Sequence, residues 1–325
     1  MKKMNPVICL LASLMCFAGP GEALAQAFPA KPITIVVPFP PGGVTDQTSR
    51  LVGQKITENT GQSVIIDNRP GAGGQIGANV VKQARPDGYT VFVANIGSHA
   101  INQTLYNKLS YDPIKDFEPV TCMIITPQIV VVPPTSPNKS IAELIAYAKA
   151  NPGKVTYASQ SIGSGGHIAG EVFKAKDKLD ILHVPYKGSA PALTDIMAGR
   201  VDFFVDAFLT AYPLIKDGRI RALAITADKR SPLLPDLPTM QELGYSGYDV
   251  NPWFGIAAPA GTPRPIIDRL NAEFVKALRH PDIVKRLADV GVDVVANSPD
   301  EFSAMIKSET ARWGEVVKAS GARAD

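Results

Sequence analysis

Residues 33–46 have the sequence ITIVVPFPPGGVTD, an apolar run followed by a loop rich in Pro and Gly. The run Ile33–Val37 is short, apolar and β-branched, which predicts a buried strand. Residues Thr45–Thr60 predict a helix that ends at Gly61, because Gly readily adopts the left-handed conformation that closes a helix. A strand, a Gly-rich loop and a helix in this order are typical of α/β proteins, in which ligands bind at the carboxyl ends of the strands.

Strands and helices continue to alternate along the whole chain. Capping boxes open helices at Ser140 and Ser298, while Asn95–His99 and Ser159–Gly166 are expected to be loops. The alternation predicts parallel sheets, and about 300 residues exceed one comfortable core, which favours two lobes. We expect further strands at 64–66, 89–94, 129–132, 155–158, 181–184, 201–205 and 222–226, and further helices at 75–84, 141–150, 167–176, 191–198, 263–278 and from 298.

The composition indicates many specified turns and a nearly neutral molecule. The chain has 27 Gly and 28 Pro among 325 residues, more than average, and they are too dispersed for a low-complexity segment. Its 33 Lys and Arg against 30 Asp and Glu give a formal net charge of +3. Nothing in this balance indicates a nucleic-acid partner. The Pro-rich stretches Thr126–Pro137 and Ser231–Pro238 are candidates for crossings between lobes, since no Gly/Ser linker separates them.

The first 27 residues are expected to be a cleaved signal peptide. Lys2 and Lys3 precede the apolar stretch Val7–Ala18, and small residues allow cleavage after residue 25 or 27. A transmembrane anchor is the alternative, but about 12 apolar residues fall short of the roughly 20 that span a bilayer. The mature protein is therefore expected in the bacterial periplasm, without a membrane span of its own.

The cysteines exclude a disulfide framework. Cys9 and Cys16 belong to the expected leader, so only Cys122 remains in the mature chain. One thiol can form neither an internal disulfide nor a thiolate metal cluster. Cys122 lies in the apolar run Val120–Val132 and is expected to be a core thiol.

The loop after the first strand is the first candidate binding site. Glycines allow backbone N–H groups to approach a ligand closely, and the start of a helix favours an anion. The alternative is a tight turn with a capping Thr. The residues expected to contact a ligand here are Phe39, Pro41, Gly42, Gly43, Thr45 and Asp46.

Two further loops are candidate binding sites for similar reasons. The segment Ser159–His167 offers Ser159, Gly163, Ser164 and His167 at a helix start, and Ser98 with His99 follows another strand. The alternatives are a flexible Gly/Ser connector and an ordinary polar turn. None of the three loops contains Lys or Arg, so an anion there would be bound by amides, hydroxyls and waters. This chemistry suits a carboxylate better than a polyphosphate.

Asp206 and Phe208 follow the strand expected at 201–205, at the end where ligands bind in α/β proteins. Asp206 would repel a bare carboxylate, so its expected roles are to hold water, to position an amide, or to meet a ligand hydroxyl or amine. A helix cap is the structural alternative. Phe39 and Phe208 could supply an apolar wall for the middle of a ligand, or could belong to the lobe cores.

Other chemistries have weak support. Residues 71–77 resemble a dinucleotide fingerprint, but Ile76 replaces its third Gly. A hydrolase would need a Ser-His-Asp arrangement of Ser98, Ser159 or Ser164 with His99 or His167, and Ser164 lacks a G-x-S-x-G context. No spacing of His and carboxylates indicates a metal, and no cofactor is expected.

Several segments together resemble one family, the solute-binding proteins of tripartite tricarboxylate transporters, also called the Bug family. The resemblance spans essentially the whole mature chain. Pro40-Pro41 and Gly166 depart from the family pattern, in which a bulkier residue is common at the latter position. The segments that carry the resemblance are 31–33, 37–43, 68–74, 86–90, 98–102, 163–167, 183–188 and 253–263.

The resemblance implies a two-lobed, type II-like periplasmic binding protein that closes on its ligand in the inter-lobe cleft. One lobe would comprise residues 28–126 and 251–325, and the other residues 127–250. The family's ligands are small carboxylates, and its two loops correspond to Phe39–Asp46 and Ser159–His167 here. We expect a monomer that binds a dicarboxylate, such as terephthalate or another phthalate, and passes it to inner-membrane transporter subunits. A sensor that presents its closed form to a signalling receptor is the alternative.

Overall fold

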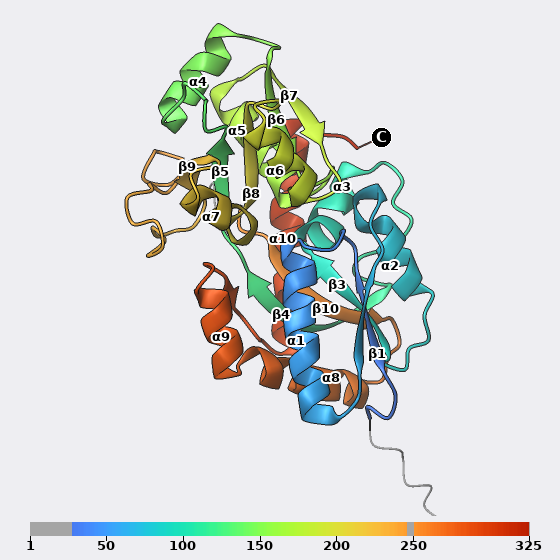
Figure 1. Ribbon diagram of the computed structural model, residues 1–325. Coiled ribbons are helices and arrows are strands. Elements are labelled where there is room, and N and C mark those ends of the chain that lie inside the picture. The colour runs from blue at the N-terminus through green and yellow to red at the C-terminus, as the bar shows by residue number, and fades with distance from the viewer. Residues whose placement is uncertain (1–27, 246–249, 325) are drawn as a thin grey trace, which may run out of the picture.

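The computed structural model describes residues 28–245 and 250–324, which form two lobes built around two β-sheets (Figure 1). The predicted signal peptide, residues 1–27, lies outside the described residues. Within the described ranges, no helix has the length and apolar character needed to cross a membrane. Cys122 is free and buried, as predicted, and burial raises the pKa of its thiol to about 12.

The first sheet has six strands, and its carboxyl edge faces the second lobe. β1 pairs in parallel with β2 and β3, whereas β10 is antiparallel to β3 and β4, and β11 is antiparallel to β4. In sheet order the strands are β11 (Asp293–Val294), β4 (Phe117–Ile125), β10 (Trp253–Pro259), β3 (Thr90–Asn95), β1 (Ile33–Val37) and β2 (Val64–Asn68).

The second sheet has five strands and also combines parallel with antiparallel pairs. β6 pairs in parallel with β7 and β8, whereas β5 is antiparallel to β8 and β9. In sheet order the strands are β7 (Ile181–Pro185), β6 (Val155–Ser159), β8 (Phe203–Ala207), β5 (Gln128–Val132) and β9 (Arg221–Ile225).

The prediction of parallel sheets is wrong, because both sheets are mixed. β4 leads almost directly into β5 through Thr126 and Pro127, with no helix between the two strands (Figure 1). β5 and β10 each begin where the chain crosses between the lobes and run away from that point. β1, β3, β6 and β8 run toward it. A strand that starts at a crossing is therefore antiparallel to neighbours that end there.

The predicted helices lie within about two residues of their positions in the structure, whereas α3, α7 and α9 were not predicted. Gly61 closes α1 in the left-handed conformation, and Ser140 and Ser298 cap α4 and α10 through the N–H groups of Glu143 and Glu301. The α-helices are α1 (Val44–Thr60), α2 (Gln75–Lys82), α3 (Asn102–Leu105), α4 (Ile141–Ala150), α5 (Gly165–Asp177), α6 (Ser189–Met197), α7 (Phe208–Lys216), α8 (Arg264–Leu278), α9 (Pro281–Ala288) and α10 (Pro299–Ser320), with short turns η1 (Ala72–Gly74) and η2 (Gly97–Ile101).

Two local predictions need correction. Residues 95–99 are not a loop, because Gly97–Ile101 form one turn of π-helix that leads into α3. The stretch Ser231–Pro238 does not cross between lobes. Its leucines Leu233, Leu234 and Leu237 pack against the core of the second lobe, and the chain instead returns to the first lobe near Pro252, whose carbonyl accepts a hydrogen bond from the Thr126 N–H at 3.0 Å.

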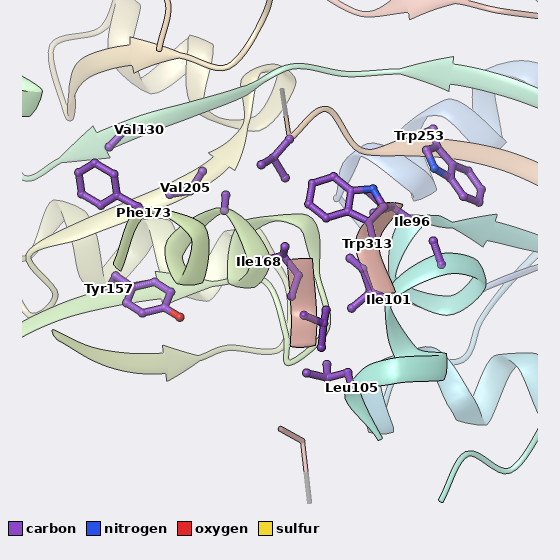
Figure 2. Close-up of a cluster of buried hydrophobic side chains, with 14 of the residues drawn as sticks. Ile96, Ile101, Leu105, Val130, Tyr157, Ile168, Phe173, Val205, Trp253 and Trp313 are labelled. Atoms are coloured by element: carbon purple, nitrogen blue, oxygen red, sulfur yellow. The ribbon is translucent and has the colours of Figure 1, made fainter. Parts of the chain in front are cut away.

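A continuous apolar cluster joins the two lobes through α10. Trp313 is 2 % exposed and donates its indole N–H to Glu309 at 2.8 Å. Figure 2 shows Trp313 with Ile168 of α5 on one side and Ile96 and Ile101 of the first lobe on the other. Since α10 packs against both α5 and η2, this helix ties the lobes together besides the two strand crossings.

Candidate ligand-binding site

A cavity lies between the two lobes, at the ends where β1, β3, β6 and β8 meet. It holds about 710 Å³ of space outside protein atoms, part of which is open to solvent. Both lobes contribute to its wall, so a ligand there would contact them simultaneously. The lining residues are Phe39, Pro40, Pro41, Gly43, Val44, Thr45, Asn95, Ile96, Thr126, Gln128, Gln160, Ser164, Gly165, Lys187, Gly188, Ser189, Ala190, Pro191, Ala207, Pro252 and Phe254.

Three helices begin at this cavity. α1 starts at Gly43 and α6 at Gly188, and neither N-cap has a side chain that satisfies the first N–H groups. α5 starts at Ser164, whose hydroxyl accepts a hydrogen bond from the His167 N–H. The free N–H groups of a helix start carry partial positive charge and favour an anion. Three such starts from two lobes suit a ligand with more than one negative group.

Asp46 holds the first loop in place through hydrogen bonds on the side away from the cavity. Its carboxylate accepts hydrogen bonds from the Gly42 N–H at 3.0 Å, from Arg50 Nε at 3.0 Å and from Asn68 Nδ2 at 3.1 Å. Asn68 also donates to the Phe39 carbonyl at 3.0 Å. Burial opposes the charge of Asp46, but these donors, led by Arg50, lower its pKa. Asp46 and Gly42 therefore lie outside the cavity wall and hold the loop that carries Phe39, Pro41, Gly43 and Thr45 on that wall.

Replacing Asp46 by Asn is expected to lower stability at pH 7 by about 1–3 kcal/mol, because the charged hydrogen bonds to Arg50 and Gly42 weaken. The pKa of Asp46 is lower in the folded than in the unfolded protein, so its stabilisation is complete above about pH 4 and disappears as the pH falls through the folded value. Melting temperatures between pH 7 and pH 3 should therefore fall less in the Asp46→Asn variant than in wild type. The exposed Asp289→Asn is the control, and parallel profiles for all three proteins would contradict the role given to Asp46.

The second predicted loop reaches the cavity through Ser164 and Gly165. The Ser164 hydroxyl donates to the Ser161 carbonyl at 2.7 Å, and the Gly163 N–H donates to His167 Nδ1 at 3.2 Å. Gly163, His167 and Ser159 lie behind the wall rather than on it. Their hydrogen bonds fix the backbone that presents the start of α5.

Close packing explains why a glycine occupies position 166. A Cβ there would lie 2.4 Å from the Val205 carbonyl oxygen and 2.4 Å from Gln160 Oε1. Because the carbonyl belongs to the backbone of β8, it cannot move aside. The absence of a side chain at 166 therefore allows α5 to start close against β8, and a bulkier residue there would push the two elements apart.

In the third predicted loop, the residues that line the cavity are sequence neighbours of the two that were predicted to bind a ligand. Ser98 and His99 are fully buried, and Asn95 and Ile96 line the cavity instead. His99 packs between Phe92 and Phe117, and burial lowers its pKa to about 3, so the ring is neutral at pH 7. Its Nδ1 lies 2.9 Å from the Ser98 hydroxyl.

Asp206 is a buried anchor beneath the wall of the second lobe. Its Oδ1 accepts hydrogen bonds from Ser189 Oγ at 2.6 Å and from Gln160 Nε2 at 2.9 Å, and its Oδ2 accepts one from Thr210 Oγ1 at 2.7 Å. Complete burial raises its pKa despite these donors. Of the roles considered for Asp206, the structure shows the positioning of an amide. Phe208 is buried in the core of the second lobe and does not line the cavity. Phe254 lines the cavity instead.

The sequence prediction missed the start of α6. Lys187 and Gly188 line the cavity, as do Ser189 and Ala190, so a cation from outside the three predicted loops reaches the wall. The segment after β7 repeats the strand, Gly and helix order of the first two loops, and this order was the available signal. Gln128 and Gln160 were also missed, since a single polar residue beside a strand carries no pattern of its own.

The serine–histidine contacts do not assemble a hydrolase site. Ser159 Oγ lies 2.6 Å from His183 Nε2, and His183 stacks on His167 with ring centroids 4.2 Å apart. Among the residues that the structure describes, neither His183 nor His99 has a hydrogen bond to a carboxylate, and these pairs lie outside the cavity wall. In the same ranges no group of His, Cys, Asp and Glu could hold a metal ion.

Comparison with known proteins identifies the family. The family model described as the tripartite tricarboxylate transporter family receptor matches residues 48–322. The chain belongs to this receptor family. It is 35 % identical to the protein BugT of Bordetella pertussis, over 99 % of both chains. The resemblance inferred from the sequence motifs is therefore confirmed.

Solved structures of similar sequence have the same fold. Rpa4515 of R. palustris, solved with adipate, is 39 % identical, with a TM-score of 0.87 over 90 % of this chain and 98 % of that one. MatC of Rhodopseudomonas palustris, solved with bound malate, is 35 % identical, with a TM-score of 0.85 over 89 % of this chain and 100 % of that one. The predicted two-lobed fold of periplasmic binding proteins is confirmed.

Proposed function

We propose that this receptor captures a small dicarboxylate in the periplasm and passes it to the membrane subunits of a tripartite tricarboxylate transporter. The observation that carries the proposal is the convergence of three helix starts, from α1, α5 and α6, on one inter-lobe cavity. Amide groups at helix starts are pre-formed donors for carboxylate oxygens. The adipate and malate in the structures of the two relatives are acids of this class.

The lining suits an acid with charged ends and an apolar middle. Phe39 and Pro41 of the first lobe and Pro252 and Phe254 near the crossings supply apolar surface. Lys187 adds a positive charge at the start of α6. We propose that one carboxylate binds at the starts of α1 and α5 and the other near α6. A linear or aromatic dicarboxylate, including terephthalate, fits this division of the wall.

Closure of the two lobes would exclude water and strengthen these hydrogen bonds. We propose that residues 28–126 and 251–325 move against residues 127–250. The Thr126 N–H bonds to the Pro252 carbonyl at 3.0 Å, and Thr226 Oγ1 bonds to Asn251 Oδ1 at 2.8 Å. These bonds join the two strand crossings side by side, which suits them to act as one hinge. We propose a monomer with a binding role and no catalytic step.

The test is the identity and affinity of the ligand. The purified protein is denatured, the released small molecules are identified by mass spectrometry, and refolded protein is titrated calorimetrically with adipate, malate, terephthalate, matched monocarboxylates, amino acids and sugars. We expect a dicarboxylate to bind and to raise the melting temperature. Stabilisation by amino acids or sugars alone would overturn the proposal.

A further inference from the structure

Gln128 stands at the junction of the cavity and the hinge. It is the first residue of β5, two positions after the crossing at Thr126, and it lines the cavity. Its backbone is fixed on both sides, because its N–H donates to Thr226 Oγ1 at 2.8 Å and its carbonyl accepts from the Thr226 N–H at 2.8 Å. The position of its side chain is thus set by the hinge itself.

The side chain of Gln128 is buried and has no hydrogen-bond partner among the described residues. The residue is 2 % exposed, and its Oε1 is completely covered without a partner in the same ranges. No hydrogen bond joins Nε2 to another described residue either. Burying an amide without partners costs free energy in the empty protein. Nearly all buried polar groups in native proteins are paired, and Nε2, unlike Oε1, is not completely covered, so the unpaired amide nitrogen at the cavity wall points to a ligand.

The start of α5 leaves room for this amide. A Cβ on Gly165 would lie only 2.6 Å from Gln128 Nε2, so the absence of a side chain at 165 admits the amide nitrogen against the first turn of the helix. Gly165 also lines the cavity. Gln128 Nε2 and the start of α5 therefore lie side by side at the cavity.

We propose that the carboxamide of Gln128 is a ligand-binding group, which donates its Nε2–H to a carboxylate oxygen of the bound acid beside the start of α5. The inference rests on the proposed function, because it takes the ligand to be a carboxylate. It adds a side-chain donor on the second lobe to the backbone donors of the helix starts. A rigid donor placed by the hinge would hold the carboxylate at low entropic cost.

The test compares Gln128→Met with wild type by calorimetric titration with the dicarboxylate that wild type binds. Methionine has nearly the same length without the amide. We expect the dissociation constant to rise about tenfold to hundredfold. We also expect the melting temperature of the ligand-free variant to equal or exceed that of wild type, because the variant no longer buries an unpaired amide.

The opposite pattern would overturn the inference. A ligand-free variant that melts well below wild type, with unchanged affinity, would give Gln128 a purely structural role. The second variant, Gln128→Glu, places a negative charge beside the ligand and should weaken binding more than Met does; equal affinity for all three proteins also refutes the inference. The exposed Gln83→Met is the control. If wild type itself binds no dicarboxylate, the proposed function fails, and this outcome differs from a failure confined to the Gln128 variants.

Discussion

Replacing Gly97 by Ala is expected to weaken ligand binding by about a hundredfold while leaving the stability of the ligand-free protein almost unchanged. Gly97 belongs to η2 in the first lobe, and a Cβ there would lie 2.6 Å from the carbonyl oxygen of Gly163 in the second lobe. Such a distance is too short, and neither a Cβ nor a carbonyl oxygen can move without the backbone to which it is bonded. The lobes would therefore have to separate at this contact.

Because we propose that ligand binding brings the lobes together, this separation should act on the ligand-bound form in particular. The backbone of Gly97 lies outside the left-handed region, so Ala fits the local conformation. Within its own lobe the nearest obstacle is Asn95 Oδ1 at 3.0 Å, which accepts hydrogen bonds from the Gly97 and Ser98 N–H groups and would have to give by a few tenths of an ångström. Forcing extra volume into a packed contact costs about 1–3 kcal/mol, and a loss near the upper limit corresponds to about a hundredfold in affinity. In the proposed open form of the empty protein this contact is absent.

Calorimetry with the ligand of the wild type measures the affinity, and small-angle X-ray scattering measures the compaction that ligand causes. The control is Gly314→Ala on α10, where the nearest atom to the new Cβ is the Thr104 hydroxyl at 3.3 Å. We expect the Gly314 variant to bind and compact as wild type does. Wild-type affinity in the Gly97 variant would show that the contact between Gly97 and Gly163 plays no part in closure.

The local structure around the first loop could be predicted because its signals are local. A β-branched apolar run marks β1, which the structure places at Ile33–Val37, and Gly61 marks the end of α1. Strand direction could not be predicted in the same way. The orientation of β5 and β10 depends on where the chain crosses between lobes. The crossing at Thr126 falls in one of the two Pro-rich stretches that were candidates, but the return near Pro252 carries no such signal.

For the candidate site, too, local sequence signals predicted some residues correctly and others wrongly. Phe39, Pro41, Gly43, Thr45 and Ser164 line the cavity, since a strand, Gly-rich loop and helix in sequence place these residues at a strand end. Ser98 and His99 carry similar signals but face inward. The His99 ring packs between Phe92 and Phe117, which are not its neighbours in the sequence. The residues next to His99 therefore gave no sign that its side chain is buried.

The role of Asp206 shows why a residue can serve a site without touching it. Its three side-chain donors come from Gln160, Ser189 and Thr210, of which Gln160 and Ser189 lie on the cavity wall. The sequence placed Asp206 at the correct end of a strand. Its partners lie on the loop after β6, on α6 and on α7, and their convergence is a property of the folded sheet that no short segment shows.

Replacing Asp206 by Leu is expected to lower the stability of the protein by about 3 kcal/mol or more and to abolish measurable ligand binding. The change leaves three buried donors without their acceptor, and each unpaired group costs about 1–3 kcal/mol. Thr210 and Gln160 retain the carbonyls of Ala207 and Val205 as alternative acceptors, at 2.9 and 3.2 Å. Ser189 has no alternative among the described residues, so the start of α6 should lose its fixed position most.

Asp206→Asn separates the charge from the shape and keeps the prediction testable even where the Leu variant does not fold. Asn retains one acceptor oxygen for Ser189 and Gln160, and the Thr210 hydroxyl can rotate to accept from the new amide. We expect this variant to lose about 1 kcal/mol of stability and to bind the ligand only a few-fold more weakly. Chemical denaturation and calorimetry measure both effects. Equal stability and affinity of the Leu variant and wild type would show that α6 and Gln160 hold their positions without the buried carboxylate.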